Sequence, residues 1–194
     1  GPARLSWLID YDSADSIFEQ IRSSSLDFKS LADPPKGLNA SLVSTWTEAS
    51  RKIDIHVFED AHLDLGIQIL DSSDDCWPFD QDTEPPCVLF CKGNLDLLEN
   101  QFKVAVVGTR RCSSVGRRVA HKFGVELAQA GVATVSGLAL GIDGSVHKGV
   151  LSASGQAIGV VGSGLDVVYP KKNYQLWDQI SEEGLLVSEN PLGT

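Results

Sequence analysis

The apolar residues between positions 5 and 63 recur at the three- and four-residue intervals of amphipathic helices. Ser13 and the polar residues 39–41 precede two of these stretches, and such residues are favoured at helix starts. The sequence DPPKG at 33–37 is a strong helix breaker between them. The pattern therefore predicts a small helical domain over residues 1–63.

The pattern changes between residues 64 and 102. Short apolar runs at 66–70 and 88–91 are separated by segments rich in Ser, Asp and Pro. This part of the chain is interpreted as a connector that contains one or two strands.

From residue 103 onward, short apolar runs alternate regularly with helical patterns. Strands are expected over 104–107, 132–135, 157–161 and 185–187, and helices over 115–130, 142–153 and 173–183. Strands without polar alternation, separated by helices, indicate a parallel sheet covered on both faces. We therefore expect an α/β fold, with an open doubly wound, Rossmann-like parallel sheet over residues 103–194.

The charge is distributed unevenly along the 194 residues, whose formal net charge is −10. Residues 1–102 carry 7 lysines and arginines against 19 carboxylates, a balance of −12, whereas residues 103–194 carry 9 against 7, a balance of +2. A polyanion responds to the local field at its docking surface. The acidic total therefore does not exclude a nucleic-acid partner for the second half.

Membrane and metal classes find no support in the sequence. The longest apolar runs fall short of the roughly 18 residues that a membrane span needs, and a cytoplasmic protein is expected. Four cysteines include one C-x3-C pair with no second pair or histidine set to complete a zinc site. Reduced thiols, no metal and no cofactor are the expectation.

The segment from 103 to 125 holds six lysines and arginines and no carboxylate. It reads as a buried apolar strand that runs into Gly108, Thr109, Arg110 and Arg111 and then into a helix. Such a concentration of positive charge at a strand end is typical of a phosphate site. Arg110 is the expected ligand, because a guanidinium matches phosphate oxygens. The helix carries Arg117, Arg118 and Lys122, whose plainer interpretation is a solvated face.

Three predicted strands end in glycine-bearing loops, at 108–110, 136–141 and 162–166. In a parallel sheet these loops share one edge, where open α/β folds place ligands. Glycine lets backbone amides approach an anion, although βα turns also favour glycine for purely structural reasons. The loops match neither G-x-G-x-x-G nor the P-loop pattern, which disfavours a nucleotide cofactor.

Two further groups adjoin these loops. Asp143 and His147 are four residues apart on one helix face, and a hydrogen bond that fixes a loop is a simpler role for them than acid–base catalysis. The segment YPKKN at 169–173 closes the third loop and places Lys171 near the same edge.

Four motifs follow one another between residues 104 and 193: VAVVGTR at 104–110, VSGLALGIDGSVH at 135–147, VGSGLDVVYPKKN at 161–173 and LVSENPLG at 186–193. Together they resemble the DNA-processing protein A family, also called Smf. The segments at 66–70 and 86–93 resemble the lead-in to that family's Rossmann-like domain, and the helical start is similar to its small, SAM-like N-terminal domain.

The resemblance implies a bacterial, non-enzymatic protein that binds single-stranded DNA, protects it during natural transformation and helps to load the RecA recombinase. By motif, the family's DNA-binding arginine corresponds to Arg110, its glycine-rich segment to 136–143, and its lysine after Tyr-Pro to Lys171. Family members usually act as dimers. A further family segment beyond the position of 191–194 supplies part of the DNA pocket, the dimer surface and the recombinase contact, so a homodimer is a weaker expectation here.

Val115 and Val146 depart mildly from the family pattern. Two rival functions remain: a nucleotide-processing Rossmann-like enzyme, whose P-G-G-x-G-T-x-x-E motif is absent, and a protein-interaction module that does not bind DNA. The expected DNA-binding residues are Gly108, Thr109, Arg110, Arg111, Ser136, Gly137, Gly141, Ile142, Asp143, Gly162, Gly164, Lys171 and Asn173, with Arg117, Arg118, Lys122 and His147 in support.

Overall fold

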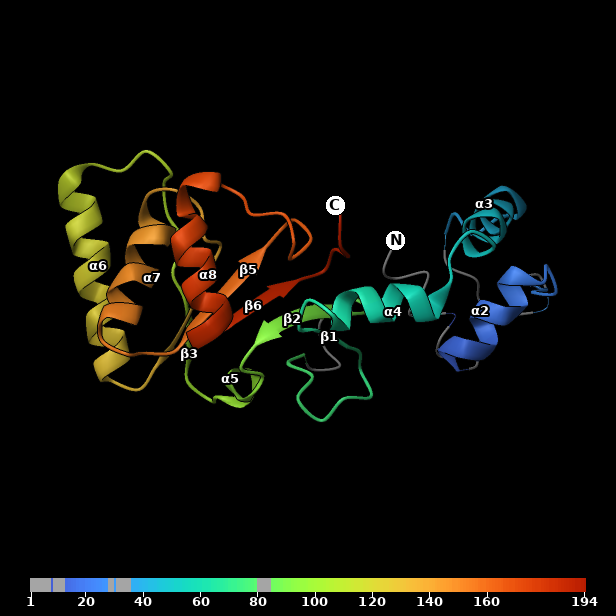
Figure 1. Ribbon diagram of the computed structural model, residues 1–194, viewed down its shortest axis with the longest axis horizontal. Helices are drawn as coiled ribbons and strands as arrows, with labels where there is room; N and C mark the ends of the chain where they lie inside the picture. The colour runs from blue at the N-terminus through green and yellow to red at the C-terminus, as the bar shows by residue number, and fades with distance from the viewer. Residues whose placement is uncertain (1–7, 9–12, 28–29, 31–35, 80–84) are drawn as a thin grey trace. The chain divides into compact units, whose positions relative to one another are not determined.

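The computed structural model describes residues 8, 13–27, 30, 36–79 and 85–194 (Figure 1). Two units are distinguished, one formed by Gly1–Ala61 with Phe79–Cys87 and the other by His62–Pro78 with Val88–Thr194. The helical spacing near the start of the chain falls on residues 5–9, of which only Leu8 is among the described residues. Of the breaker at 33–37, only residues 36 and 37 are described.

The first unit contains α2 (Ala14–Arg22), α3 (Ala40–Ser50) and most of α4 (Ile55–Leu63). The side chain of Ser13 accepts a hydrogen bond from the N–H of Ser16, and the side chain of Asn39 accepts one from the N–H of Leu42. These caps satisfy N–H groups that a first helical turn leaves unpaired, which explains why both helices begin where the polar residues predict. The apolar faces meet in a small core of Leu8, Ile17, Ile21, Leu26 and Trp46.

The second unit is built on a six-stranded sheet. Its strands are β1 (Ile67–Leu70), β2 (Leu89–Gly93), β3 (Lys103–Ala105), β4 (Ala133–Ser136), β5 (Ala157–Val161) and β6 (Leu185–Ser188), in the order β1-β2-β6-β5-β4-β3. Strands β3 to β6 are parallel, whereas β2 pairs antiparallel with both β1 and β6. The α/β class with a mainly parallel sheet is thus confirmed. The segment interpreted as a connector contributes β1 and β2 to this same sheet.

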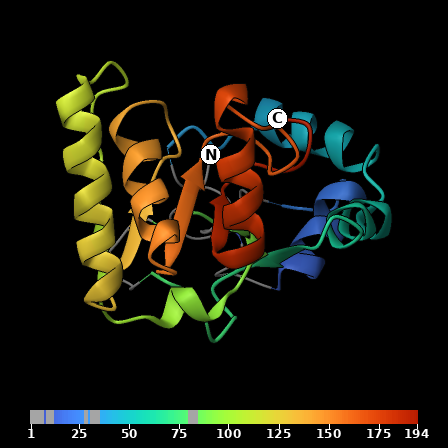
Figure 2. The same ribbon diagram turned by 60° about the vertical axis from the view of Figure 1, so that its left-hand side comes forward.

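The helices of the second unit are α5 (Asp96–Glu99), α6 (Ser114–Gln129), α7 (Ile142–Ser152) and α8 (Tyr174–Glu183), preceded by a 3-10 turn at Lys171–Asn173. The parallel strands lie in sequence order, and right-handed crossovers then bring their connecting helices to one face. Figure 2 shows α6, α7 and α8 side by side as one layer.

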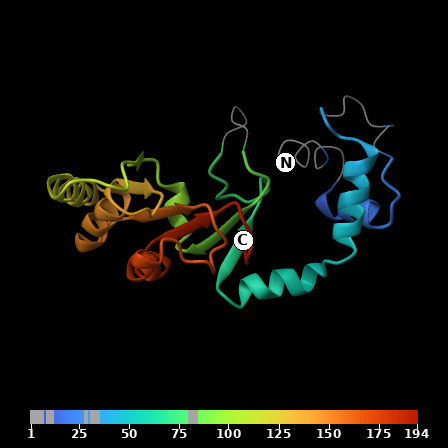
Figure 3. The ribbon, with the colours of Figure 1, turned by 90° about the horizontal axis from the view of Figure 1, so that it is seen from above.

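Each face of the sheet carries its own core. On β6, Leu186 faces the cluster that includes residues of α7 and α8, whereas Leu185 and Val187 face a second cluster with Leu97 and Leu98 of α5. Figure 3 shows α7 and α8 on one side of the strands. The expected covering of both faces is therefore present, but the second cover is the short α5 and the segment around Trp77.

The sequence-based picture of β3 as a buried strand over 104–107 is wrong. The strand spans Lys103–Ala105, all three residues are exposed, and Val107 is 79% exposed. The reason is topological, because β3 is the edge strand and pairs only with β4 among the described strands. An apolar run indicates a strand, but it does not indicate how many neighbours the strand has.

Candidate nucleic-acid interface

Asp143 holds together the loops that follow β3 and β4. Its Oδ1 accepts a hydrogen bond from the N–H of Gly108 at 3.1 Å, and its Oδ2 accepts one from the N–H of Gly137 at 3.2 Å. The residue is buried at 4% exposure. These two N–H groups are therefore occupied within the protein, and the idea that they cradle a phosphate does not hold. The interpretation of Asp143 as a group that fixes a loop agrees with this geometry.

Ser136 and His147 are also internal. The hydroxyl of Ser136 donates to the carbonyl of Val106 at 2.6 Å, and Nε2 of His147 lies 3.4 Å from the carbonyl oxygen of Ser136. Burial lowers the pKa of His147 to about 4, against the weaker opposing effects of the Ser136 carbonyl and Asp143. His147 is consequently neutral at physiological pH and adds no positive charge to the edge.

The loop at 136–141 also packs closely against the loop at 108–110. Gly141 has a φ of +93°, and a Cβ atom there would overlap the carbonyl oxygen of Thr109. The N–H of Ile142 donates to this same carbonyl at 3.3 Å. A residue other than glycine would push the two loops apart.

Asn173 attaches the third segment to the second loop. Its Nδ2 donates to the carbonyls of Leu138 at 2.8 Å and Ala139 at 3.2 Å, and the side chain is largely buried. The N–H of Gly164 donates to the carbonyl of Thr194, so this amide is occupied as well. Ser136, Asp143 and Asn173 were expected to bind DNA, but they build the edge rather than face outward from it, whereas Arg110, Arg111 and Lys171 are exposed.

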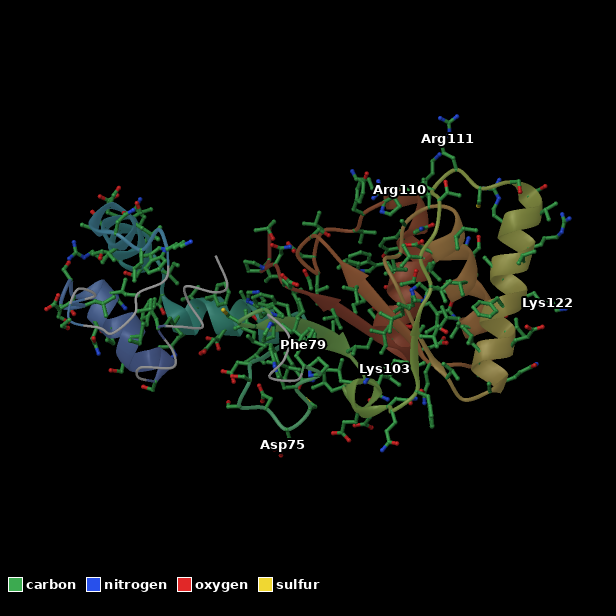
Figure 4. All side chains as sticks on the ribbon, turned by 180° about the vertical axis from the view of Figure 1, so that it is seen from behind. Asp75, Phe79, Lys103, Arg110, Arg111 and Lys122 are labelled. Atoms are coloured by element: carbon green, nitrogen blue, oxygen red, sulfur yellow. The ribbon has the colours of Figure 1, made fainter. Side chains whose placement is uncertain are left out.

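An open cavity of about 320 Å³ lies at this edge. It is lined by Arg110, Gly137, Ala139, Leu140, Val161, Gly162, Ser163, Tyr169 and Pro170. Arg110 is the one charged side chain in this lining, and Figure 4 shows it over the strand ends, whereas Arg111 extends into solvent. The set of residues expected from the sequence omits six lining residues, although all six stand inside the quoted motifs: Ala139, Leu140, Val161, Ser163, Tyr169 and Pro170.

The six cations of segment 103–125 do not form a single cluster. Lys103 donates its Nζ to the carbonyl of Leu98 at 2.5 Å, away from the glycine loops. Lys122 forms an ion pair with Glu126 at 3.6 Å on α6. Lys171 is exposed and lines a different depression, together with Asp166. Arg110 is thus the member of the group that reaches the cavity.

Arg117 and Arg118 line another cavity, between α6 and α7.

No cluster of His, Cys, Asp and Glu among the described residues could hold a metal ion, and no helix in the described part is long and apolar enough to cross a membrane. None of the four cysteines forms a disulfide bond.

A mainly parallel sheet, with motif-built loops and an arginine-lined open cavity at the carboxyl ends of its strands, defines an α/β protein suited to hold an extended anion. Residues 68–194 match the model of the family described as DNA recombination-mediator protein A. The chain belongs to this DprA/Smf family, as its four motifs indicate.

Two curated DprA proteins are similar in sequence to a large part of this chain. The DNA processing protein DprA of Bacillus subtilis is 34% identical over 174 residues, which cover 82% of this chain and 59% of the relative. The DprA of Streptococcus pneumoniae is 44% identical over 136 residues, which cover 68% of this chain and 48% of the relative. The chain therefore spans about half the length of the curated relatives it matches.

Two solved structures are similar to this one. The crystal structure of DprA from S. pneumoniae has a TM-score of 0.66 at 39% identity and covers 81% of this chain and 54% of that one. A structure of DNA processing protein A from Helicobacter pylori, described as revealing its single-stranded DNA binding mode, has a TM-score of 0.57 at 31% identity and covers 66% of this chain and 57% of that one.

Proposed function

We propose that this chain binds single-stranded DNA without sequence preference, by holding backbone phosphates at the cavity beside Arg110. The observation that carries this proposal is the exposed Arg110 guanidinium in an open cavity with no carboxylate in its lining. The choice of single-stranded DNA as the ligand is supported by the related H. pylori protein, whose structure concerns its single-stranded DNA binding mode.

The cavity suits a backbone better than a base. Apart from Arg110, its polar groups are those of Ser163, Tyr169 and the main chain, which provide no set of side chains to read base edges. Tyr169 is 63% exposed and offers a ring on which a base can stack, whereas Trp177 is buried in the core and offers none. Contacts to phosphates and to ring faces tolerate every base, so broad sequence tolerance follows.

The other predicted site residues take two roles in this proposal. Arg111 and Lys171 are exposed, and each directly follows a lining residue in the sequence, so they attract outer phosphates. Asp143, Ser136 and Asn173 position the loops, as do Gly141 and the buried His147. With about three to five phosphates neutralised, log affinity falls against log salt with a slope of roughly −2 to −4.

Two adjacent arginines provide a matched test. Oligo-dT is titrated by fluorescence anisotropy with the wild type, Arg110→Ala and Arg111→Ala, which remove the same charge one residue apart. Arg110→Ala should weaken binding about tenfold or more and flatten the salt slope by about one, whereas Arg111→Ala should change affinity about threefold or less. Equal losses in both variants would show only a diffuse field, and no loss in Arg110→Ala would reject the site. Oligo-dC and oligo-dA should give the same ranking.

We infer that the bound DNA is passed to a RecA-type recombinase and is protected meanwhile from nucleases in the bacterial cytoplasm, without covalent chemistry on the DNA. The family's description as a recombination mediator supports this role. Purified chain should accelerate RecA filament assembly on oligo-dT and slow its digestion by an exonuclease. The same chain extended beyond Thr194 tests whether these activities, and dimerisation, need further residues. Acceleration by neither form would reject the mediator role.

A further inference from the structure

A further open cavity, of about 500 Å³, lies between α6 and α7. It is lined by Arg117, Arg118, His121, Ser145 and Lys148. We call these five residues the α6–α7 groove. Its lining differs completely from that of the Arg110 cavity, and three of its five residues were not singled out by their sequence pattern.

The groove exists because two glycines let the helices approach closely. A Cβ atom on Gly124 of α6 would overlap the carbonyl oxygen of Val146, and one on Gly149 of α7 would overlap the carbonyl oxygen of His121. Backbone therefore packs against backbone below the groove. Arg117 and His121 are four residues apart on α6, and Ser145 and Lys148 are three apart on α7, so each helix presents its pair on one face.

The positive charge of the groove is not neutralised by the protein. Within the described residues, no ion pair involves Arg117, Arg118 or Lys148. The only carboxylate on α6 is Glu126, which pairs with Lys122 instead. The only carboxylate on α7 is Asp143, which is buried and receives two backbone N–H groups. Three cations gathered from two helices around one depression repel one another until an anion lies among them.

We propose that the α6–α7 groove is a second backbone-binding site, which takes the phosphates of the DNA strand after it leaves the Arg110 cavity. This rests on the proposed function. Both helices begin at the edge of the sheet that carries the Arg110 cavity: Arg117 stands in the first turn of α6 and Ser145 in the first turn of α7. Cations spread over two helices around an open groove match an extended polyanion of about two or three phosphates better than one small enclosed ion.

The length of the oligonucleotide separates the two sites. An oligo-dT of about 6 nucleotides fills the Arg110 cavity, whereas one of about 20 nucleotides also reaches the groove. The double variant Arg117→Ala/Arg118→Ala should bind the short oligonucleotide like the wild type, bind the long one about tenfold more weakly, and flatten its salt slope by about two. Lys148→Ala should act in the same direction, with a slope change of about one.

Lys122→Ala is the matched control, because it removes a cation from the same helix outside the groove. It should leave both affinities within about twofold of the wild type. The inference is overturned if the groove variants bind the long oligonucleotide normally, or if Lys122→Ala loses as much as they do. Circular dichroism and thermal melting confirm that the variants fold. If the wild type binds neither oligonucleotide, the proposed function itself fails. If Arg110→Ala lowers the affinity for DNA but the groove variants do not, only the groove is rejected and the proposed function stands.

Discussion

Replacement of Asp143 tests whether one buried carboxylate holds together the sheet edge that carries the Arg110 cavity. In Asp143→Asn the side chain keeps one acceptor oxygen, but its NH2 group faces an N–H donor where the second carboxylate oxygen stood. In Asp143→Ala both Gly108 and Gly137 lose their partner. Hydrogen bonds to a charged group contribute about 1.5–3 kcal/mol each, so loss of the pair in this buried setting costs about 3–6 kcal/mol. The Asn variant should lose about half of that amount.

Urea unfolding gives the change in the free energy of unfolding, and hydrogen exchange gives its location. Exchange should accelerate in the peptides that cover 106–111 and 136–143 before it changes elsewhere. Asp166→Ala is the control, because its carboxylate also accepts a backbone N–H, that of Gly193, but is exposed. This control should lose less than about 1 kcal/mol. An Asp143→Ala variant as stable as the control, with unchanged exchange in both peptides, would refute the reasoning.

Three further outcomes are expected. The pKa of His147 is lowered from 6.5 to about 4 in the folded protein, so its contribution to stability is complete above the unfolded pKa and is lost as pH falls from about 6.5 toward 4. The urea midpoint of the wild type should therefore fall between about pH 7 and about pH 5, and His147→Gln should make this fall smaller; parallel curves for the two proteins would contradict this. Gly149→Ala should destabilise the protein by about 1–3 kcal/mol through backbone overlap, whereas Gly162→Ala, with nothing within 4 Å of the added Cβ, should change the melting temperature little. Burial raises the pKa of Cys91 to about 12, so this thiol should resist maleimide in the native state and react only on unfolding. The partly exposed Cys112 should react before Cys91, and mass spectrometry of the labelled protein decides the order.

Local patterns were sufficient to predict most elements of the fold, but not α5, which lies in the segment interpreted as a connector with one or two strands. The caps at Ser13 and Asn39, and the strand and helix alternation after residue 103, are consequences of periodicity and of unpaired N–H groups at helix starts, which depend only on neighbouring residues. The position of β3 at the sheet edge could not be predicted in this way. It depends on strand order, which brings together segments far apart in the chain.

The candidate site likewise has features that follow from local sequence and features that depend on contacts between distant segments. The sequence by itself determined the class of fold, the motifs that identify the family and the prominence of Arg110, because these are properties of residue type and short spacing. Only the tertiary structure decided that Asp143 occupies the N–H of Gly108, 35 residues away, and that Arg117 shares a groove with Lys148 of another helix. Each backbone N–H has one hydrogen to donate, and whether it faces a ligand or a partner within the protein depends on packing between distant segments.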